Sequence, residues 1–78
     1  MPHVIVKMHR GRTDEQKQRL ATAITKNLVE IAESAENTVS VAIEDFDPAD
    51  WPEAVYRPDI LNGSGTLVRP PGYNPFED

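Results

Sequence analysis

The chain has no cysteine, so neither a disulfide bond nor a thiolate-bound zinc ion can reinforce its core. Histidine is almost as scarce, and the two that occur, His3 and His9, are too few and too poorly spaced to suggest a metal site. The sequence therefore predicts a protein that works without a metal and without a cofactor.

Long apolar runs are absent as well. None approaches the roughly 18 residues that a membrane-spanning helix needs. The N-terminus also lacks the charged-then-apolar pattern of a secretion signal. We therefore expect a cytoplasmic protein.

Positive charge is in short supply, because eight Lys and Arg residues face 13 Asp and Glu residues and leave a net charge of −5. A general nucleic-acid binder would normally show a basic face, so this balance argues against one. Three of the positive side chains, Lys7, Arg10 and Arg12, nevertheless lie within six positions of one another. Such a cluster could face an anionic small molecule.

Among the residues that are present, Pro2 is the most informative, because it follows Met1 and opens a predicted strand. A small second residue favours removal of the initiator methionine, which would leave a secondary amine at Pro2. An α-amino group titrates near about pH 8, and burial would lower its pKa by disfavouring the charged form. A neutral amine near pH 7 can act as a general base or a nucleophile.

The first 46 residues predict a strand, a long helix and a second strand. Alternating side chains predict strands over 2–8 and 38–46, and Gly11 in the intervening loop is free to adopt a positive φ. Thr13 and Gln16 fit a capping box that opens a helix over about 14–33. The apolar stripe of this helix consists of Leu20, Ile24, Leu28 and Ile31. A βαβ unit of this kind, in the α/β (α+β) class, has parallel strands.

The rest of the chain, 47–78, predicts an irregular tail within a single domain that spans 1–78. Six of the seven prolines fall at or beyond Pro48, and Pro52 and Pro58 argue against any long regular element between them. Asn62 to Gly65 predicts a turn, and Thr66 to Val68 a short strand. The predicted packing anchors of the tail are Trp51, Val55, Tyr56, Ile60, Leu61, Leu67, Val68, Tyr73 and Phe76.

This architecture predicts a partner. A two-stranded sheet covered by one helix leaves its edges unpaired and one face open, with Ile5 and Ala42 as apolar candidates on that face. A symmetric homodimer is the commonest solution. The alternative is a monomer whose tail folds back over its own sheet.

Three segments carry a resemblance to a known family. Pro2 opening a strand, Gly11-Arg-Thr-Asp-Glu-Gln-Lys17 opening a long helix, and the strand Val39-Ser-Val-Ala-Ile-Glu44 together resemble the 4-oxalocrotonate tautomerase family. The resemblance covers about residues 2–51. The tail, with Val55-Tyr-Arg-Pro-Asp-Ile60 and Pro70-Pro-Gly-Tyr73, is similar to the longer bacterial branch of phenylpyruvate tautomerase-like proteins. That branch implies dimers, where the short members are hexamers.

The resemblance implies an isomerase that moves a proton between the keto and enol forms of a 2-keto acid. The family's catalytic proline falls on Pro2, the arginine that contacts a substrate carboxylate falls on Arg12, and the aromatic residue that makes the site apolar falls on Trp51. A second family arginine aligns with Ser40, where this chain departs from the pattern. Serine carries no charge, so it would stabilise an enolate less than arginine does.

Each of these positions also has a purely structural interpretation. Arg12 could be a solvated loop arginine, Trp51 a packing anchor and Ser40 a surface residue. His3, beside Pro2, could tune or orient a substrate, but a strand-surface histidine is the favoured interpretation. Two other functions also stay open. A cationic Pro2 could act as an acid to decarboxylate, hydrate or dehalogenate an unsaturated acid. A retained Met1 would instead make the chain a non-catalytic oligomeric module, because an amide nitrogen cannot be a base.

Overall fold

The computed structural model describes residues 1–63 and 66–77. Its elements follow the order β1 (His3–His9), α1 (Asp14–Ile31), η1 (Glu36–Thr38), β2 (Ser40–Phe46) and η2 (Pro52–Leu61). The chain divides into two compact units, Met1–Asp45 and Phe46–Asp78. We describe each unit by itself.

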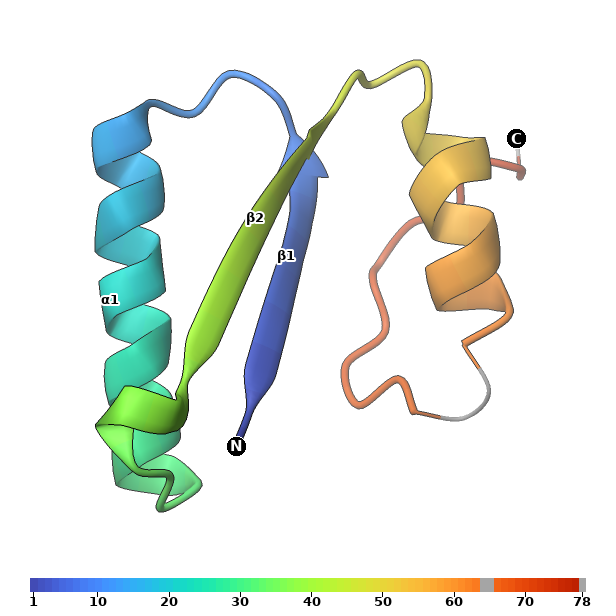
Figure 1. Cartoon of the computed structure of the whole chain (residues 1–78). Helices are drawn as coiled ribbons and strands as arrows, with labels where there is room; N and C mark the ends of the chain where they lie inside the picture. Colours follow the sequence, from blue (N-terminus) through green and yellow to red (C-terminus); the bar gives the residue numbers. More distant parts are fainter. Residues whose placement is uncertain (64–65, 78) are drawn as a thin grey trace. The chain divides into compact units, whose positions relative to one another are not determined.

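The first unit is a βαβ arrangement. The strands β1 and β2 pair in a two-stranded sheet, run in the same direction, and are connected through α1, which covers one face of the sheet (Figure 1). The backbone amide of Ser40 donates a hydrogen bond to the carbonyl of Pro2 at 3.2 Å, so the two strands start side by side. The predicted fold class and parallel pairing are confirmed.

The start of α1 follows the predicted capping box. The amide of Gln16 donates to the Thr13 hydroxyl at 3.1 Å, and the amide of Thr13 donates to the Gln16 side-chain oxygen at 2.8 Å. Two orphan amides of the helix N-terminus are thereby satisfied. The loop before the helix has Gly11 at φ 121°, as predicted, a conformation in which a side chain would be strained.

The second strand begins two residues later than the alternation predicts. Both the amide and the hydroxyl of Thr38 bond to the carbonyl of Ala35, at 3.0 and 2.7 Å, and draw residues 36–38 into the short helix η1. A local hydrogen bond from threonine therefore prevails over the strand pattern at this point. The end of α1 also comes earlier, at Ile31, and Glu33 takes a left-handed conformation with φ 58°.

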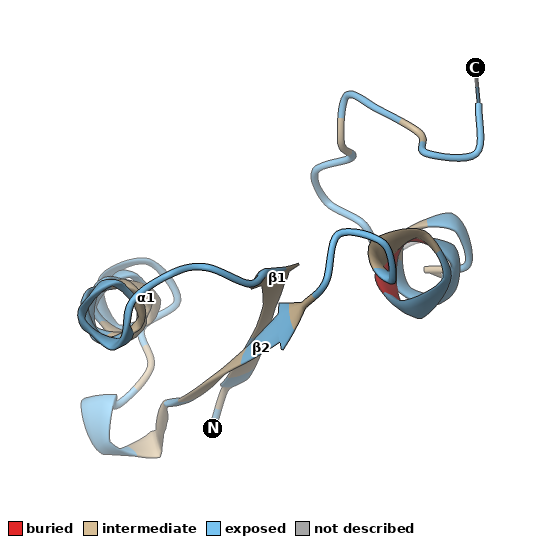
Figure 2. Cartoon of the chain, turned by 90° about the horizontal axis from the view of Figure 1, so that it is seen from above, coloured by how far each residue is buried: buried red, intermediate tan, exposed pale blue. Residues whose placement is uncertain are grey.

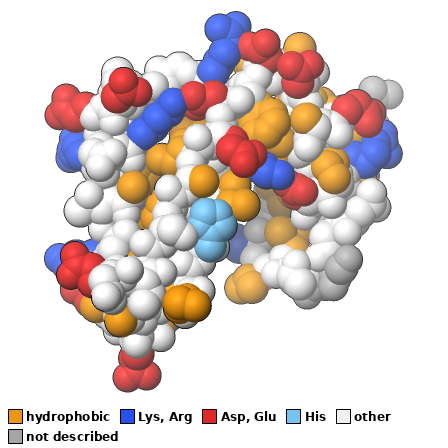
Figure 3. Space-filling model, viewed as in Figure 1, with side chains coloured by type: hydrophobic (Ala, Val, Ile, Leu, Met, Phe, Trp, Pro, Cys, Tyr) orange, Lys and Arg blue, Asp and Glu red, His pale blue; other side chains and the backbone are white. Residues whose placement is uncertain are grey.

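The first unit has no fully buried side chain among its described residues (Figure 2). Leu20, Ile24 and Leu28 lie on the partly covered stripe of α1 as predicted. Ile31, predicted to continue this stripe, is instead 80% exposed, and Ile5 on the sheet is 51% exposed. Figure 3 shows hydrophobic side chains at the molecular surface among charged ones. The apolar surface of a lone chain is therefore incompletely covered.

The second unit corrects the prediction of an irregular tail. Pro52–Leu61 forms a ten-residue helix of π type, preceded by a turn in which the Asp50 amide donates to the Asp47 carbonyl. Pro52 stands at the first helical position, where its missing N–H has no partner to lose. The amide of Asn62 reaches back five residues to the carbonyl of Arg57, at 3.1 Å. In this wide pattern Pro58 avoids the clash with the carbonyl four residues back that an α-helix would impose.

Tyr56 and Val55 form the core of the second unit, with 5% and 3% of their surface exposed. The Tyr56 hydroxyl donates to the carbonyl of Tyr73 at 2.7 Å, and its ring packs against those of Tyr73 and Phe76 at centroid distances of 5.4 and 6.0 Å. The aromatic anchors thus hold the C-terminal segment onto η2.

The predicted strand at Thr66 to Val68 does not form. The amide and hydroxyl of Thr66 both bond to the carbonyl of Gly63, at 3.1 and 2.8 Å, and residues 66–68 are not assigned to a strand. Residues 64 and 65 of the turn predicted over 62–65 lie outside the described residues.

Charged side chains interrupt the longest helix, α1, and among residues 1–63 and 66–77 no helix is long and apolar enough to cross a bilayer. The cytoplasmic location stays a prediction.

Candidate active site

Pro2 lies directly before β1 and is half-buried, while Met1 is fully exposed beyond it. The hydrogen bond from Ser40 fixes the backbone of Pro2 at the point where both strands of the sheet begin. Because hydrogen-bonded strands lie about 4.8 Å apart, Ser40 is a direct neighbour of Pro2. The predicted catalytic proline and the position of the missing family arginine are therefore brought together.

The Ser40 side chain is held by His3, for which the sequence favoured a strand-surface role over one in the site. Its hydroxyl oxygen lies 2.6 Å from Nδ1 of His3, which is the first residue of β1. Both residues are exposed. Alternation alone puts His3 and Ser40 on the face away from the helix stripe, but only the register of the two strands makes them partners.

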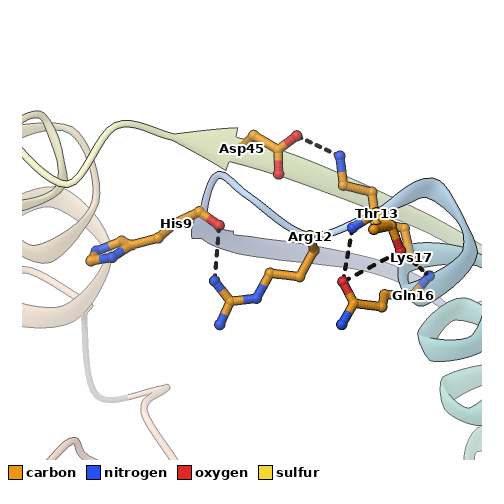
Figure 4. A network of polar contacts seen from close by, with 6 residues as sticks. All are labelled: His9, Arg12, Thr13, Gln16, Lys17 and Asp45. Carbon is orange, nitrogen blue, oxygen red and sulfur yellow. Dashed lines mark hydrogen bonds and ion pairs between the residues drawn. The ribbon is translucent and has the colours of Figure 1, made fainter.

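Arg12 lies at the other end of the sheet. It is exposed in the loop between β1 and α1, and its Nη1 donates to the carbonyl of His9 at 3.5 Å, a long and weak hydrogen bond (Figure 4). The six steps from His3 to His9 cover about 20 Å at 3.3 Å each. Arg12 and Pro2 of one chain therefore stand at opposite ends of β1 and cannot touch one small substrate.

The surroundings of Arg12 are well organised. The capping box of Thr13 and Gln16 follows it directly, and Lys17 of α1 forms an ion pair with Asp45 near the end of β2 (Figure 4). These contacts tie the first turn of α1 to the sheet. The loop that presents Arg12 is consequently anchored at its helix end.

Trp51 belongs to the second unit. It stands immediately before η2, half-buried, with its indole N–H donating to the Tyr73 hydroxyl at 2.8 Å and its ring edge-on to Phe46 at 6.2 Å. The packing interpretation of this residue is thereby supported. Its indole N–H is engaged, so Trp51 offers a ligand chiefly the apolar surface of its ring.

Arg57, an arginine of η2, is engaged within the second unit. It contacts Glu53 through two side-chain hydrogen bonds, at 2.9 and 3.1 Å, and its guanidinium lies 4.3 Å from the centre of the Phe76 ring. The hydrogen bond from Arg57 holds the pKa of the Glu53 carboxyl below its usual value. Arg57 thus has a structural role that competes with anion binding.

The grooves on the first unit are lined by residues other than the predicted site residues Pro2, Arg12, Ser40 and Trp51. One open groove runs between α1 and the start of β2 and is lined by Ala21, Thr25, Val29, Glu36 and Val41 among others. A second is lined by residues of α1 alone. Neither groove includes any of the four predicted site residues.

Comparison with known proteins places most of this chain alongside tautomerases. The family model described as "Tautomerase enzyme" matches residues 2–55. The chain is 40% identical over 73 residues to a "Probable tautomerase" of Xylella fastidiosa, covering 94% of this chain and 89% of the relative. It is 39% identical over 74 residues to "Tautomerase PptA" of Cronobacter sakazakii, covering 94% and 97%.

A solved structure shows the same fold. The crystal structure of YwhB, described as a homologue of 4-oxalocrotonate tautomerase, matches with a TM-score of 0.58 and 41% identity, over 59% of this chain and 75% of that one. The family model covers more than half of the chain, and both relatives match over nearly their full length. The resemblance read from the sequence is confirmed: the chain belongs to the tautomerase family, that of 4-oxalocrotonate tautomerase, and is an isomerase.

Proposed function

We propose that this tautomerase interconverts the enol and keto forms of a 2-keto acid, with the amine of Pro2 as the general base after removal of Met1. The observation that carries the proposal is the family match, which begins at residue 2. The full exposure of Met1 supports it, because the processed residue makes no buried contact that its removal would cost.

The proposed chemistry is a 1,3-proton shift. The neutral amine takes the proton of the enol hydroxyl, the electron pair of that O–H bond forms the carbonyl, and the C=C electrons take up a proton at C3 from the resulting ammonium. One amine therefore serves as base and then as acid, and the reaction needs no external reactant. A neutral amine is maintained best beside an apolar wall, the role we propose for Trp51.

The substrate carboxylate needs a cation, and we propose Arg12 of a second copy. Arginine suits a carboxylate because its planar guanidinium can donate two parallel hydrogen bonds. The separation of Arg12 from Pro2 along β1 argues that the two act on one substrate only across an interface.

A homodimer is the assembly that we propose. Ile5 and Ile31 are 51% and 80% exposed, and the described part of the first unit has no buried side chain. A βαβ unit this poorly covered is marginal alone. A second copy would cover apolar surface and supply Arg12 in the same step.

Intact mass spectrometry and steady-state kinetics test the proposal together. We expect a mature chain that begins at Pro2 and turns over phenylenolpyruvate, with kcat/KM rising with pH through the pKa of the amine because a base must be neutral. Pro2→Ala keeps a primary amine but changes its geometry and basicity, so turnover should fall strongly. Retained Met1, undiminished turnover in folded Pro2→Ala, or a rate that falls as the amine loses its proton would contradict the mechanism.

A further inference from the structure

The pairing of His3 with Ser40 has no role in the chemistry described so far. Their side chains meet at 2.6 Å across the two strands, although the residues are 37 positions apart in the chain. Both are exposed, so water could satisfy each of them separately, and ordering two exposed side chains costs conformational entropy. The contact stands beside the backbone of Pro2, to which the Ser40 amide is bonded.

We propose that His3 is a positioning residue that aims the Ser40 hydroxyl at the reacting oxygen of the substrate, an inference that rests on the proposed function. In this arrangement Nδ1–H of His3 donates to Oγ of Ser40. The hydroxyl oxygen has then accepted its hydrogen bond, and its own proton is left to be donated outward. The opposite tautomer would consume that proton in the bond to the ring.

The position of the Ser40 hydroxyl beside Pro2 suits a substrate with an enol or carbonyl oxygen and a single carboxylate. The amine of Pro2 is a backbone nitrogen at the strand end, so a substrate at that nitrogen can also reach the side chain of Ser40 on the neighbouring strand. A neutral hydroxyl matches the enol or carbonyl oxygen, whose charge is partial in the ground state and grows toward the enolate. It cannot neutralise a second carboxylate as an arginine would. The pair therefore selects monocarboxylic 2-keto or enol acids over dicarboxylic ones.

A double-mutant cycle on phenylenolpyruvate tests this role. Loss of a preorganised donor to a developing oxyanion costs about a hundred- to a thousandfold in kcat in a water-excluded site. Because Ser40 is exposed, we expect Ser40→Ala to lose less, about tenfold or more, with KM little changed because the bond strengthens in the transition state. His3→Leu should lose activity in the same way. Since His3 acts through Ser40, the double variant should lose no more than Ser40→Ala alone.

Conservative variants and a control sharpen the cycle. His3→Asn places an amide N–H where Nδ1–H stands and should recover most of the loss in His3→Leu, and Ser40→Thr should keep the hydroxyl function. Thr22→Ala removes an exposed hydroxyl of α1 that donates to its own helix, to the Gln18 carbonyl at 3.0 Å, and should leave turnover unchanged. Thermal melting should show all variants folded, because the altered side chains are exposed.

A second measurement does not depend on turnover. Long-range ¹H–¹⁵N spectra recorded at alkaline pH, where a histidine ring is neutral, should show the ring proton of His3 on Nδ1, and Ser40→Ala should shift it toward Nε2. A neutral ring protonated on Nε2 in the wild type, wild-type kinetics in His3→Leu, or additive losses in the double variant would overturn this inference alone. A wild-type protein without turnover, or an undiminished Pro2→Ala variant, would overturn the proposed function and this inference with it.

Discussion

Mixing two inactive variants should restore activity if the site is shared between copies. The strand β1, which lies between Pro2 and Arg12 in the chain, is about 20 Å long, so each proposed site takes Pro2 from one chain and Arg12 from another. Pro2→Ala chains lack the base, and Arg12→Ala chains lack the cation. Neither homo-oligomer has an intact site, but a mixed one does.

The recovered activity can be calculated. After equal amounts are unfolded and refolded together, half of all sites carry an intact Pro2, and half of those meet a neighbour with an intact Arg12. Random assembly therefore gives about a quarter of the wild-type activity, and the same fraction holds for a dimer and for larger rings. Before mixing, the Arg12→Ala variant has low activity. Loss of a charge-assisted hydrogen bond worth about 1.5–3 kcal/mol lowers its kcat/KM by roughly ten- to a hundredfold.

The assay is the initial rate on phenylenolpyruvate before and after co-refolding. Each variant refolded alone controls for damage, and a mixture of Pro2→Ala with Arg19→Ala, an exposed arginine of α1, should return about half of the wild-type rate through the Arg19→Ala chains. If exchange of chains is verified by mass spectrometry and the Pro2→Ala and Arg12→Ala mixture stays at the average of its components, the shared site is refuted. Arg12 would then not be the carboxylate ligand, and Arg10 would be tested next.

Three further predictions follow from the same geometry. Ser40→Arg adds a cation beside Pro2, so it should raise kcat/KM on a dicarboxylate such as 2-hydroxymuconate relative to kcat/KM on phenylenolpyruvate. If steady-state kinetics give an unchanged ratio of the two values, residue 40 is not a substrate contact. Thr13→Ala removes the cap of α1 and should lower the free energy of unfolding, measured with denaturant, by about 1 kcal/mol. Thr22→Ala should leave it nearly unchanged, and equal effects of the two variants would contradict the capping role. Light scattering at micromolar concentration should give twice the chain mass of 8.7 kDa, and dilution into monomers should abolish turnover; an active monomer would refute the shared site.

The parts of the fold that depend on neighbours in sequence were predictable. The capping box of Thr13 and Gln16 needs only residues three apart, and it appears with both predicted hydrogen bonds. The parallel βαβ pairing follows from a long helix between two strand patterns. Local competition explains the error at Thr38, where the same residue could extend a strand or bond back to Ala35.

The tail was mispredicted because the rule applied to it was an α-helical one. Pro58 excludes an ordinary helix, but the π pattern around it removes the clash, and burial of Val55 and Tyr56 stabilises the segment. Burial by distant aromatic residues cannot be read from a window of a few positions. The tail therefore has more regular structure than its proline content indicates.

The candidate site was predictable residue by residue but not as an assembly. Resemblance indicates Pro2 and Arg12, yet a strand of seven residues puts them at opposite ends of the sheet, which is why we propose that a second copy supplies Arg12. The exposed Ile5 and Ile31 give that copy an energetic reason to bind, because burial of apolar surface drives association. In the dimer that we propose, assembly and catalysis depend on the same partner, because the second copy both covers exposed apolar surface and supplies Arg12.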